Sequence, residues 1–155
     1  MNNKIVLAFS GGLDTSFCVP YLKEKGYEVH TVMVNTGGFS AEEEKAIETR
    51  ALTLGAASHK NVNAVETYYS KGIRYLIYGN ILKNATYPLS VSSERVFQAL
   101  EVLRHVKEIG AGAVAHGSTG AGNDQVRFDI VFEILAPEVK IIAPVRDEGF
   151  TRQFE

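Results

Sequence analysis

The sequence contains a single cysteine, Cys18, among 155 residues. One cysteine cannot form an internal disulfide, and the four histidines lie too far apart to suggest a zinc site. No apolar segment approaches the roughly 18 residues that a membrane span requires, and the first residues lack the layout of a signal peptide. These absences argue against disulfide-stapled, zinc-binding and membrane proteins, and they predict a cytoplasmic location.

Neither sign of charge is in large excess. Sixteen basic and eighteen acidic residues give a net charge of -2, with no run of basic residues that could follow a nucleic-acid backbone. We therefore expect no nucleic-acid partner and no membrane partner. The hydrophobic fraction of 45% is enough for the core of one globular domain.

Short apolar runs alternate with longer segments of helical period. This alternation predicts an α/β fold, a three-layer structure in which a mostly parallel sheet has helices on both faces. Ser40 and Glu43 form a capping-box pattern at one helix start, and Pro20 predicts a kink or a late start in the first helix. The expected strands cover 4–9, 28–35, 58–62, 113–116 and 140–145. The expected helices cover 14–25, 40–55, 65–81, a long segment that follows an irregular stretch at 84–94 and ends at 109, and one beginning at Asn123.

Two glycine-rich loops follow predicted strands, "SGGLDTS" (residues 10–16) and "GSTGAGND" (residues 117–124). Ligands collect at the carboxyl ends of parallel strands, where glycines and helix N-termini expose N–H groups to an anion. Neither loop matches a Walker A or a Rossmann pattern, because the first has no lysine after its last glycine and the second runs G-x-x-G-x-G. Both loops at one sheet edge favour a nucleotide site with a second ligand pocket beside it.

Simpler interpretations of both loops remain open from the residues alone. The first could be a tight turn with Asp14 as helix cap, although Asp14 could also be a partner of phosphate-bound Mg²⁺. The second could be a flexible loop that ends in an Asn123 cap. Asp124 and Arg127 could form an ordinary i,i+3 ion pair.

The first loop resembles the S-G-G-x-D-S pyrophosphate loop of the N-type ATP pyrophosphatases. "GSTGAGNDQVRF" resembles a segment of one family among them, argininosuccinate synthase, and "YPL" at 87–89 with Ser92 resembles the citrulline loop of that family. The resemblance implies an adenine nucleotide alpha hydrolase-like, Rossmann-like fold, with residues 1–155 forming an ATP-binding domain that stops before a synthetase domain. The last residues, "TRQFE", read as a helix barely begun, which fits a piece of a longer chain.

The resemblance also implies which residues bind each substrate, with no catalytic side chain and no metal ligand assigned. It places ATP on Ala8, Phe9, Ser10, Gly11, Gly12, Leu13, Asp14, Thr15, Ser16 and Gly117. It places citrulline on Tyr87, Ser92, Asn123 and Arg127, and aspartate on Thr119, Asn123 and Asp124.

The implied activity is that of a ligase of arginine biosynthesis that uses ATP and Mg²⁺. The citrulline ureido oxygen attacks the α-phosphate and releases pyrophosphate, and the aspartate amine then displaces AMP to give argininosuccinate. Full-length members resemble homotetramers. We expect this short chain to carry the ATP-binding part and to turn over poorly alone.

Two features depart from the family pattern. Ala121 stands where the family usually has lysine, and "PLSVSSERV" replaces the usual P-L-G-T-S-L-A-R-P while it keeps Ser92 and Arg95. Two alternatives therefore stay open: another ATP pyrophosphatase, such as a thiolating enzyme, and a non-catalytic nucleotide-binding module.

Overall fold

Five parallel strands form the central sheet of the computed structural model, which describes residues 3–149 and only the backbone of Lys83 and Val91. The strand order is β3-β2-β1-β6-β7, and every neighbouring pair is parallel. The strands are β1 (Lys4–Ala8), β2 (Glu28–Asn35), β3 (Ser58–Asn63), β6 (Ala113–His116) and β7 (Lys140–Ile142).

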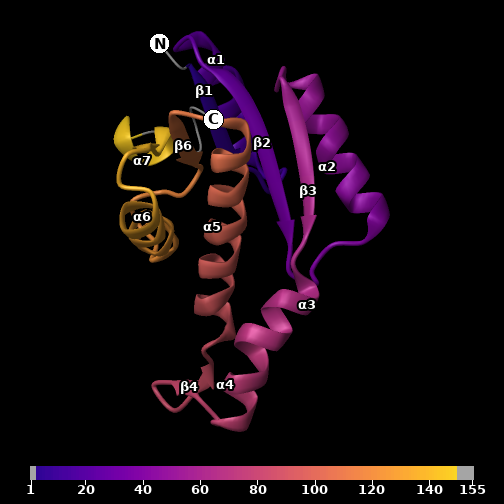
Figure 1. Ribbon diagram of the computed structural model, residues 1–155, viewed down its shortest axis with the longest axis vertical. Coiled ribbons are helices and arrows are strands. Elements are labelled where there is room, and N and C mark those ends of the chain that lie inside the picture. The colour runs from indigo at the N-terminus through magenta and orange to yellow at the C-terminus, as the bar shows by residue number, and fades with distance from the viewer. Residues whose placement is uncertain (1–2, 150–155) are drawn as a thin grey trace.

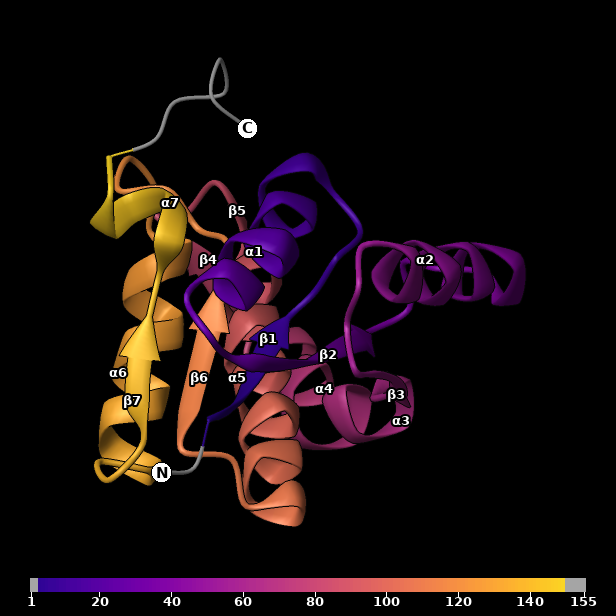
Figure 2. The same ribbon diagram turned by 90° about the horizontal axis from the view of Figure 1, so that it is seen from above.

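Helices cover both faces of this sheet (Figure 2). Residues of β1 alternate between the two cores: Ile5 and Leu7 pack with α1 (Leu13–Glu24) and α2 (Ala41–Thr53), whereas Val6 packs with α5 (Ser90–Ile109) and α6 (Asp124–Leu135). Alternation follows from the period of two in a strand, and burial on both faces explains why β1 is apolar from Ile5 to Ala8. The predicted three-layer α/β fold is confirmed.

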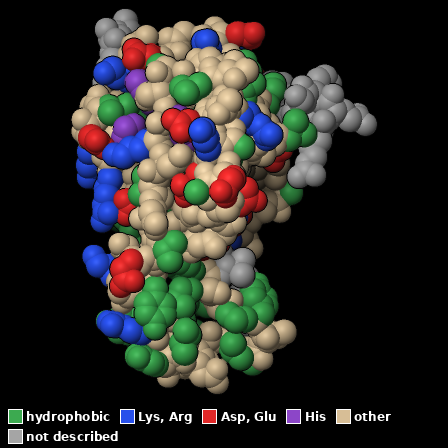
Figure 3. Space-filling view, turned by 90° about the vertical axis from the view of Figure 1, so that its right-hand side faces the viewer, with side chains coloured by type: hydrophobic (Ala, Val, Ile, Leu, Met, Phe, Trp, Pro, Cys, Tyr) green, Lys and Arg blue, Asp and Glu red, His purple; other side chains and the backbone are tan. Residues whose placement is uncertain are grey.

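An arm of short elements extends beyond the carboxyl ends of β2 and β3 (Figure 1). It comprises α3 (Val65–Tyr68), the π-helical η1 (Tyr69–Ile73), α4 (Arg74–Tyr78) and the antiparallel hairpin of β4 (Leu82–Lys83) and β5 (Tyr87–Pro88). Hydrophobic side chains gather on the surface of this arm (Figure 3), among them Tyr75 and Tyr78, which are 56% and 78% exposed.

The prediction of one helix over 65–81 is wrong in detail, because a π-helical turn interrupts it and the helix ends at Tyr78. Gly72 lies in that turn, where an added Cβ would be 2.9 Å from Cε2 of Phe97 on α5. A π-turn changes the helical register locally, which is consistent with this close approach to the neighbouring helix.

The hairpin was not predicted, and α5 begins earlier than the sequence suggested. Asn84 and Ala85 both have positive φ, at 53° and 55°, and they form the turn between β4 and β5. Helix α5 then begins at Ser90 and ends before Gly110, whose φ of 64° makes it the left-handed residue expected at a helix end.

Three other helix boundaries test the sequence rules. The capping box is confirmed, since the Glu43 N–H donates to Ser40 Oγ at 3.3 Å and the Ser40 N–H donates to Glu43 Oε2 at 2.8 Å. Helix α1 begins before Pro20, so the alternative of a late start is wrong. The last strand ends at Ile142 and not at residue 145, because Pro144 has no N–H to donate to a sheet and begins the short α7 (Pro144–Asp147).

The expected helix start at 151–155 lies outside the described residues. Within residues 3–149, no helix is both long enough and apolar enough to span a membrane.

Candidate functional site

The two glycine-rich loops lie side by side at the carboxyl edge of the sheet. They do so because β1 and β6 are neighbours, with Ala8 opposite His116 in the register. Gly117 packs against the start of α1: a Cβ on Gly117 would lie 2.9 Å from Thr15 Cγ2 and 3.1 Å from Thr15 N. Only glycine allows this close approach. The pairing of β1 with β6 confirms the prediction that both loops share one edge of the sheet.

The first loop turns sharply into α1. Gly11 has a φ of 74° and Gly12 is the N-cap residue. The Thr15 hydroxyl donates to the Gly12 carbonyl at 3.3 Å and also lies 3.3 Å from Ser10 Oγ. The first N–H groups of any helix have no intrahelical acceptor. The residues at the start of α1, Leu13 to Thr15, line the pocket together with Ser10. The loop therefore has the donor arrangement of an anion site.

Arg50 of α2 stabilises this loop by a hydrogen bond to its backbone. Its Nη1 donates to the carbonyl oxygen of Gly11. Ile47, one turn earlier on the same helix, would be 2.9 Å from a Cβ on Gly11. The turn is thus fixed by both its positive φ and the packing of α2.

Asp14 lies in the first turn of α1, so its predicted role as the helix cap is wrong: Gly12 occupies that position. The Oδ1 atom of Asp14 is buried with no hydrogen-bond partner among the described residues, and so is the Oγ atom of Ser16. Buried polar atoms are nearly always paired in native proteins, so an unpaired carboxylate oxygen beside an anion loop fits a role in holding a cation there. Residues 3–149 contain no group of three His, Cys, Asp or Glu side chains placed to hold a metal.

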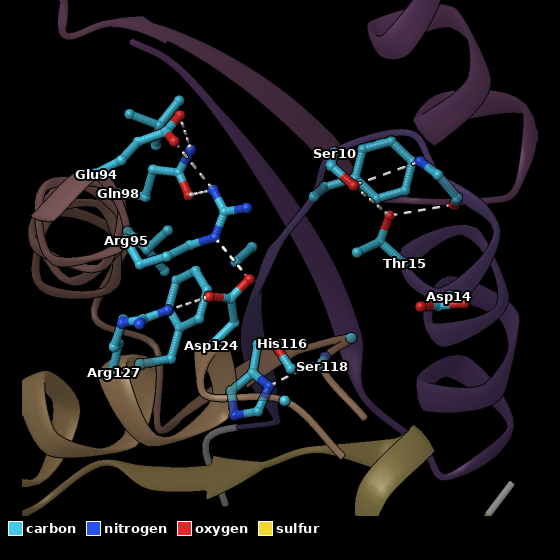
Figure 4. A pocket seen from close by; sticks show the side chains of 18 of the residues that line it. Ser10, Asp14, Thr15, Glu94, Arg95, Gln98, His116, Ser118, Asp124 and Arg127 are labelled. Carbon is cyan, nitrogen blue, oxygen red and sulfur yellow. Dashed lines mark hydrogen bonds and ion pairs between the residues drawn. The ribbon is translucent and has the colours of Figure 1, made fainter. Parts of the chain in front are cut away.

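The wall opposite α1 carries a charged cluster from α5 and α6 (Figure 4). The Asp124 carboxylate accepts a hydrogen bond from Arg127 Nη1 at 2.6 Å and one from Arg95 Nε at 3.1 Å. Arg127 also donates to Ser92 Oγ at 3.0 Å. The simple ion pair of Asp124 and Arg127 is thus present, but it belongs to a larger cluster whose carboxylate is held by two guanidinium groups.

His116 lies at the base of the second loop and is 1% exposed. Its Nδ1 accepts the Ser118 N–H at 3.3 Å, and its Nε2 lies 2.9 Å from Asp129 Oδ1. Because a backbone N–H can only donate, the neutral ring carries its proton on Nε2 and donates it to Asp129. Burial is the largest cause that lowers the pKa of His116, and Asp129 acts in the opposite direction. The ring is therefore neutral near pH 7.

These walls border a pocket of about 880 Å³ that is open to solvent. Its size is within the usual range for small-ligand sites. Most of the predicted residues line it: Ala8, Phe9, Ser10, Gly12, Leu13, Asp14, Thr15, Tyr87, Ser92, Gly117, Thr119, Asn123, Asp124 and Arg127. Gly11 and Ser16 do not line the pocket, since Gly11 turns its carbonyl toward Arg50 and the Ser16 hydroxyl is buried. Asn123 is the N-cap residue of α6 but makes no side-chain cap bond.

Other lining residues were not identified as site residues from the sequence. They come from the end of β2 and the loop after it, from α5, from the end of β6 and the second loop, and from α6: Val32, Met33, Val34, Gly38, Phe39, Glu94, Arg95, Gln98, Val102, His116, Ser118, Gly122 and Phe128. The residues after β2 were detectable in principle, because they follow a predicted strand at the same sheet edge. No local signal marks the inward face of α5.

Comparison with known proteins identifies relatives along nearly the whole chain. The family model of the arginosuccinate synthase N-terminal HUP domain matches residues 4–155. An argininosuccinate synthase from Xanthomonas axonopodis is 48% identical over 92% of this chain, and one from Pyrobaculum aerophilum is 45% identical over 99%. The chain spans about a third of the length of these curated relatives, 34% and 38% respectively.

Similar solved structures share the fold at low sequence identity. A predicted subunit of a tRNA methyltransferase from Methanocaldococcus jannaschii has a TM-score of 0.62 and 20% identity, covering 97% of this chain and 70% of its own. An NH3-dependent NAD synthetase from Campylobacter jejuni has a TM-score of 0.58 and 12% identity, covering 77% and 48%. These similarities support the predicted α/β fold.

Proposed function

Since this chain belongs to the argininosuccinate synthase family, we propose that it forms the ATP-binding part of a ligase that joins citrulline and aspartate. In this proposal residues 1–155 are the nucleotide domain of a longer protein that also has a synthetase domain. The ligation consumes ATP and releases pyrophosphate and AMP, as a step of arginine biosynthesis.

The observation that carries the proposal is the contact between Gly117 and Thr15. It joins a helix N-terminus suited to phosphate with a second loop that leads directly to Asn123 and Asp124. The opposite wall then brings Ser92 and Arg127 to the same pocket. A nucleotide phosphate and two amino-acid substrates can therefore meet in one cavity.

The first loop would bind the phosphates of ATP. Its backbone N–H groups and the hydroxyls of Ser10 and Thr15 are donors for phosphate oxygens, and they stabilise negative charge that develops on the phosphates during transfer. The residues fit a magnesium ion, since Mg²⁺ in nucleotide sites usually takes one or two carboxylates together with phosphate oxygens and water. Asp14, with its unpaired buried Oδ1, would hold it. When bound, the ion would neutralise charge on the phosphates.

The amino-acid substrates would lie along the second loop and the charged cluster. Arg127 presents a planar fork that suits a carboxylate and donates to the Ser92 hydroxyl, and Tyr87 lines the same pocket. We assign these three residues and Asn123 to citrulline. We assign Thr119, Asn123 and Asp124 to aspartate. The Asp124 carboxylate can accept a hydrogen bond from the ammonium group of that substrate.

Alignment is the main contribution that this chemistry needs from the protein. The citrulline ureido oxygen bonds to the α-phosphorus while the bond to pyrophosphate breaks. The aspartate ammonium loses one proton to solvent, and the nitrogen of the free amine then bonds to the ureido carbon. AMP leaves with the former ureido oxygen, and the attacking nitrogen loses a second proton to solvent. Holding three reactants in one pocket supplies the required proximity without a protein nucleophile.

Calorimetric titration of this chain tests the proposal. We expect ATP to bind with Mg²⁺ present, and citrulline to add a second binding signal to the ATP-bound chain. Absence of ATP binding would refute the proposal, and ATP binding without any effect of citrulline or aspartate would favour a non-catalytic nucleotide-binding module.

Gly12→Val provides the matched variant for that titration. Gly12 has a φ of -75°, and a Cβ there meets only Ser10 Oγ at 3.5 Å, so the fold tolerates a side chain. The valine would nevertheless occupy the space needed by phosphate. We expect ATP binding to be lost while the helical circular dichroism signal is retained; unchanged binding would mean that the loop is only a turn.

A further inference from the structure

The second loop is tied to α6 and α7 by a closed ring of hydrogen bonds. Two arms of this ring leave one guanidinium, that of Arg146 on α7, and they reach the loop at two points, Ser118 and Gly120. None of the bonds in the ring involves the residues assigned above to ATP, citrulline or aspartate.

The first arm runs through the base of the loop. Arg146 Nη1 donates to Asp129 Oδ2, and Asp129 Oδ1 accepts from His116 Nε2 at 2.9 Å. His116 Nδ1 accepts the Ser118 N–H at 3.3 Å. The imidazole is fixed further by stacking on Phe128, with ring centroids 5.5 Å apart and planes 18° apart. Every hydrogen bond in this arm can run in only one direction, because at least one of its ends is a group that only donates or only accepts.

The second arm runs through Gln125 in the first turn of α6. Its Oε1 accepts from Arg146 Nη1 at 3.3 Å, and its Nε2 donates to the carbonyl oxygen of Gly120 at 2.7 Å. Because the arginine occupies the amide oxygen, the amide NH₂ faces the loop. Arg146 thereby sets the orientation of both side chains that reach the loop.

Arg146 is itself held in place. Its Nε donates to Asp147 Oδ1 at 2.9 Å, and Asp147 Oδ2 accepts the Ala143 N–H at 2.9 Å at the start of α7. The guanidinium side chain is 27% exposed, so these bonds are only partly screened by water. The anchor of the ring is therefore a fixed charged group and not a mobile surface arginine.

We propose that Arg146 is a positioning residue that holds the loop of residues 117–123 over the pocket through His116 and Gln125. The effect of Arg146 on ligand binding rests on the function proposed above, because the loop that it positions carries Gly117 and Thr119. The hydrogen bonds of Arg146 go to Gln125, Asp129 and Asp147, so it acts on the loop through the two arms.

Amide hydrogen exchange of the unliganded chain, followed by ATP titration, tests this role. Arg146→Met removes the anchor of both arms, and we expect exchange of the amides of residues 117–123 to become about tenfold faster and ATP to bind about tenfold more weakly. Arg104→Met is the matched control, since Arg104 is 64% exposed on α5 and pairs with Glu101. We expect that control to behave as the unmodified chain in both measurements.

Gln125→Glu separates positioning from stability. Glutamate keeps an oxygen for Arg146 but loses the N–H that donates to Gly120, so we expect faster loop exchange and weaker ATP binding at an unchanged melting temperature. The proposal would be overturned if the amides of residues 117–123 exchanged at the same rate in both variants as in the unmodified chain. It would also be overturned if they exchanged faster while the affinity for ATP stayed unchanged. If the unmodified chain itself fails to bind ATP, the proposed function is lost, while the exchange rates still decide whether Arg146 holds the loop.

Discussion

Gly117 lies directly against Thr15, so that the second glycine-rich loop rests on the first turn of α1. The space for a Cβ on Gly117 is taken by the Thr15 methyl group at 2.9 Å and by the backbone at 3.1 and 3.2 Å. A methyl group can shift, but the backbone of a helix start cannot shift without disturbing the first loop. This contact sets the separation of the two loops.

Gly117→Ala should therefore destabilise the fold. We expect a loss of about 1–3 kcal/mol in the free energy of unfolding, the usual cost of overpacking a tight site, measured by urea denaturation. Gly122→Ala lies in the same loop but its Cβ would meet nothing closer than the Asp124 nitrogen at 4.0 Å, so it should change stability by less than about 0.5 kcal/mol. Equal stability of both variants would show that the loops can separate freely.

Asp14→Asn should weaken the dependence of ATP binding on magnesium. The variant keeps the shape of the side chain but removes the charge of an oxygen that has no protein partner among the described residues. We expect affinity for ATP with Mg²⁺ to fall by about tenfold, the size of one charge-assisted interaction, with a smaller change when EDTA is present. Calorimetry in both buffers measures the difference; equal losses in the two would remove Asp14 from the magnesium site.

Ser40→Ala should destabilise the chain through α2. The substitution removes one half of the capping box, in which Ser40 Oγ accepts the Glu43 N–H, and we expect a cost of about 1 kcal/mol in urea denaturation. Thr53→Ala is the control, because the Thr53 hydroxyl bonds only the Thr49 carbonyl within the same helix. A cost for Thr53→Ala as large as that for Ser40→Ala would contradict the capping argument.

Stability should fall as the pH drops below about 6.5, the ordinary pKa of histidine in an unfolded chain. Burial lowers the pKa of His116, with Arg146 acting in the same direction and Asp129 and Asp147 against it. The unfolded state therefore binds more protons below that pH, so the contribution of His116 is complete above it and is lost as the pH falls toward the lowered pKa.

His116→Gln identifies that contribution in urea denaturation between pH 7.5 and 5, since glutamine can replace both hydrogen bonds without titrating. We expect the unfolding free energy of this variant to decline less steeply with falling pH. Burial also lowers the pKa of His59, so His59→Gln must be measured beside it. Identical slopes for the unmodified chain and His116→Gln would contradict the prediction.

The pattern of strands and helices was readable from the sequence because it depends on local periodicity and on capping residues. The positions of β1, β2 and β6 and the Ser40 capping box follow from that local information. The loop residues of the pocket could be predicted for the same reason, since a parallel sheet brings strand ends to one edge. The assignment of Tyr87, Ser92 and Arg127 came from family resemblance, because their loop and helix carry no distinctive local signal.

Only the tertiary structure decided which charged side chains, distant in the sequence, form ion pairs. Arg95 and Asp124 are separated by 29 residues, and Arg146 and Asp129 by 17. Each of these pairs forms where one element packs against another, so no sequence period reports it. The π-turn at Gly72 lies against Phe97 of a different helix, a contact that no local sequence pattern reports. The sequence by itself determined which segments form the sheet and where ligands gather, whereas packing between elements determined which side chains hold the second loop in place.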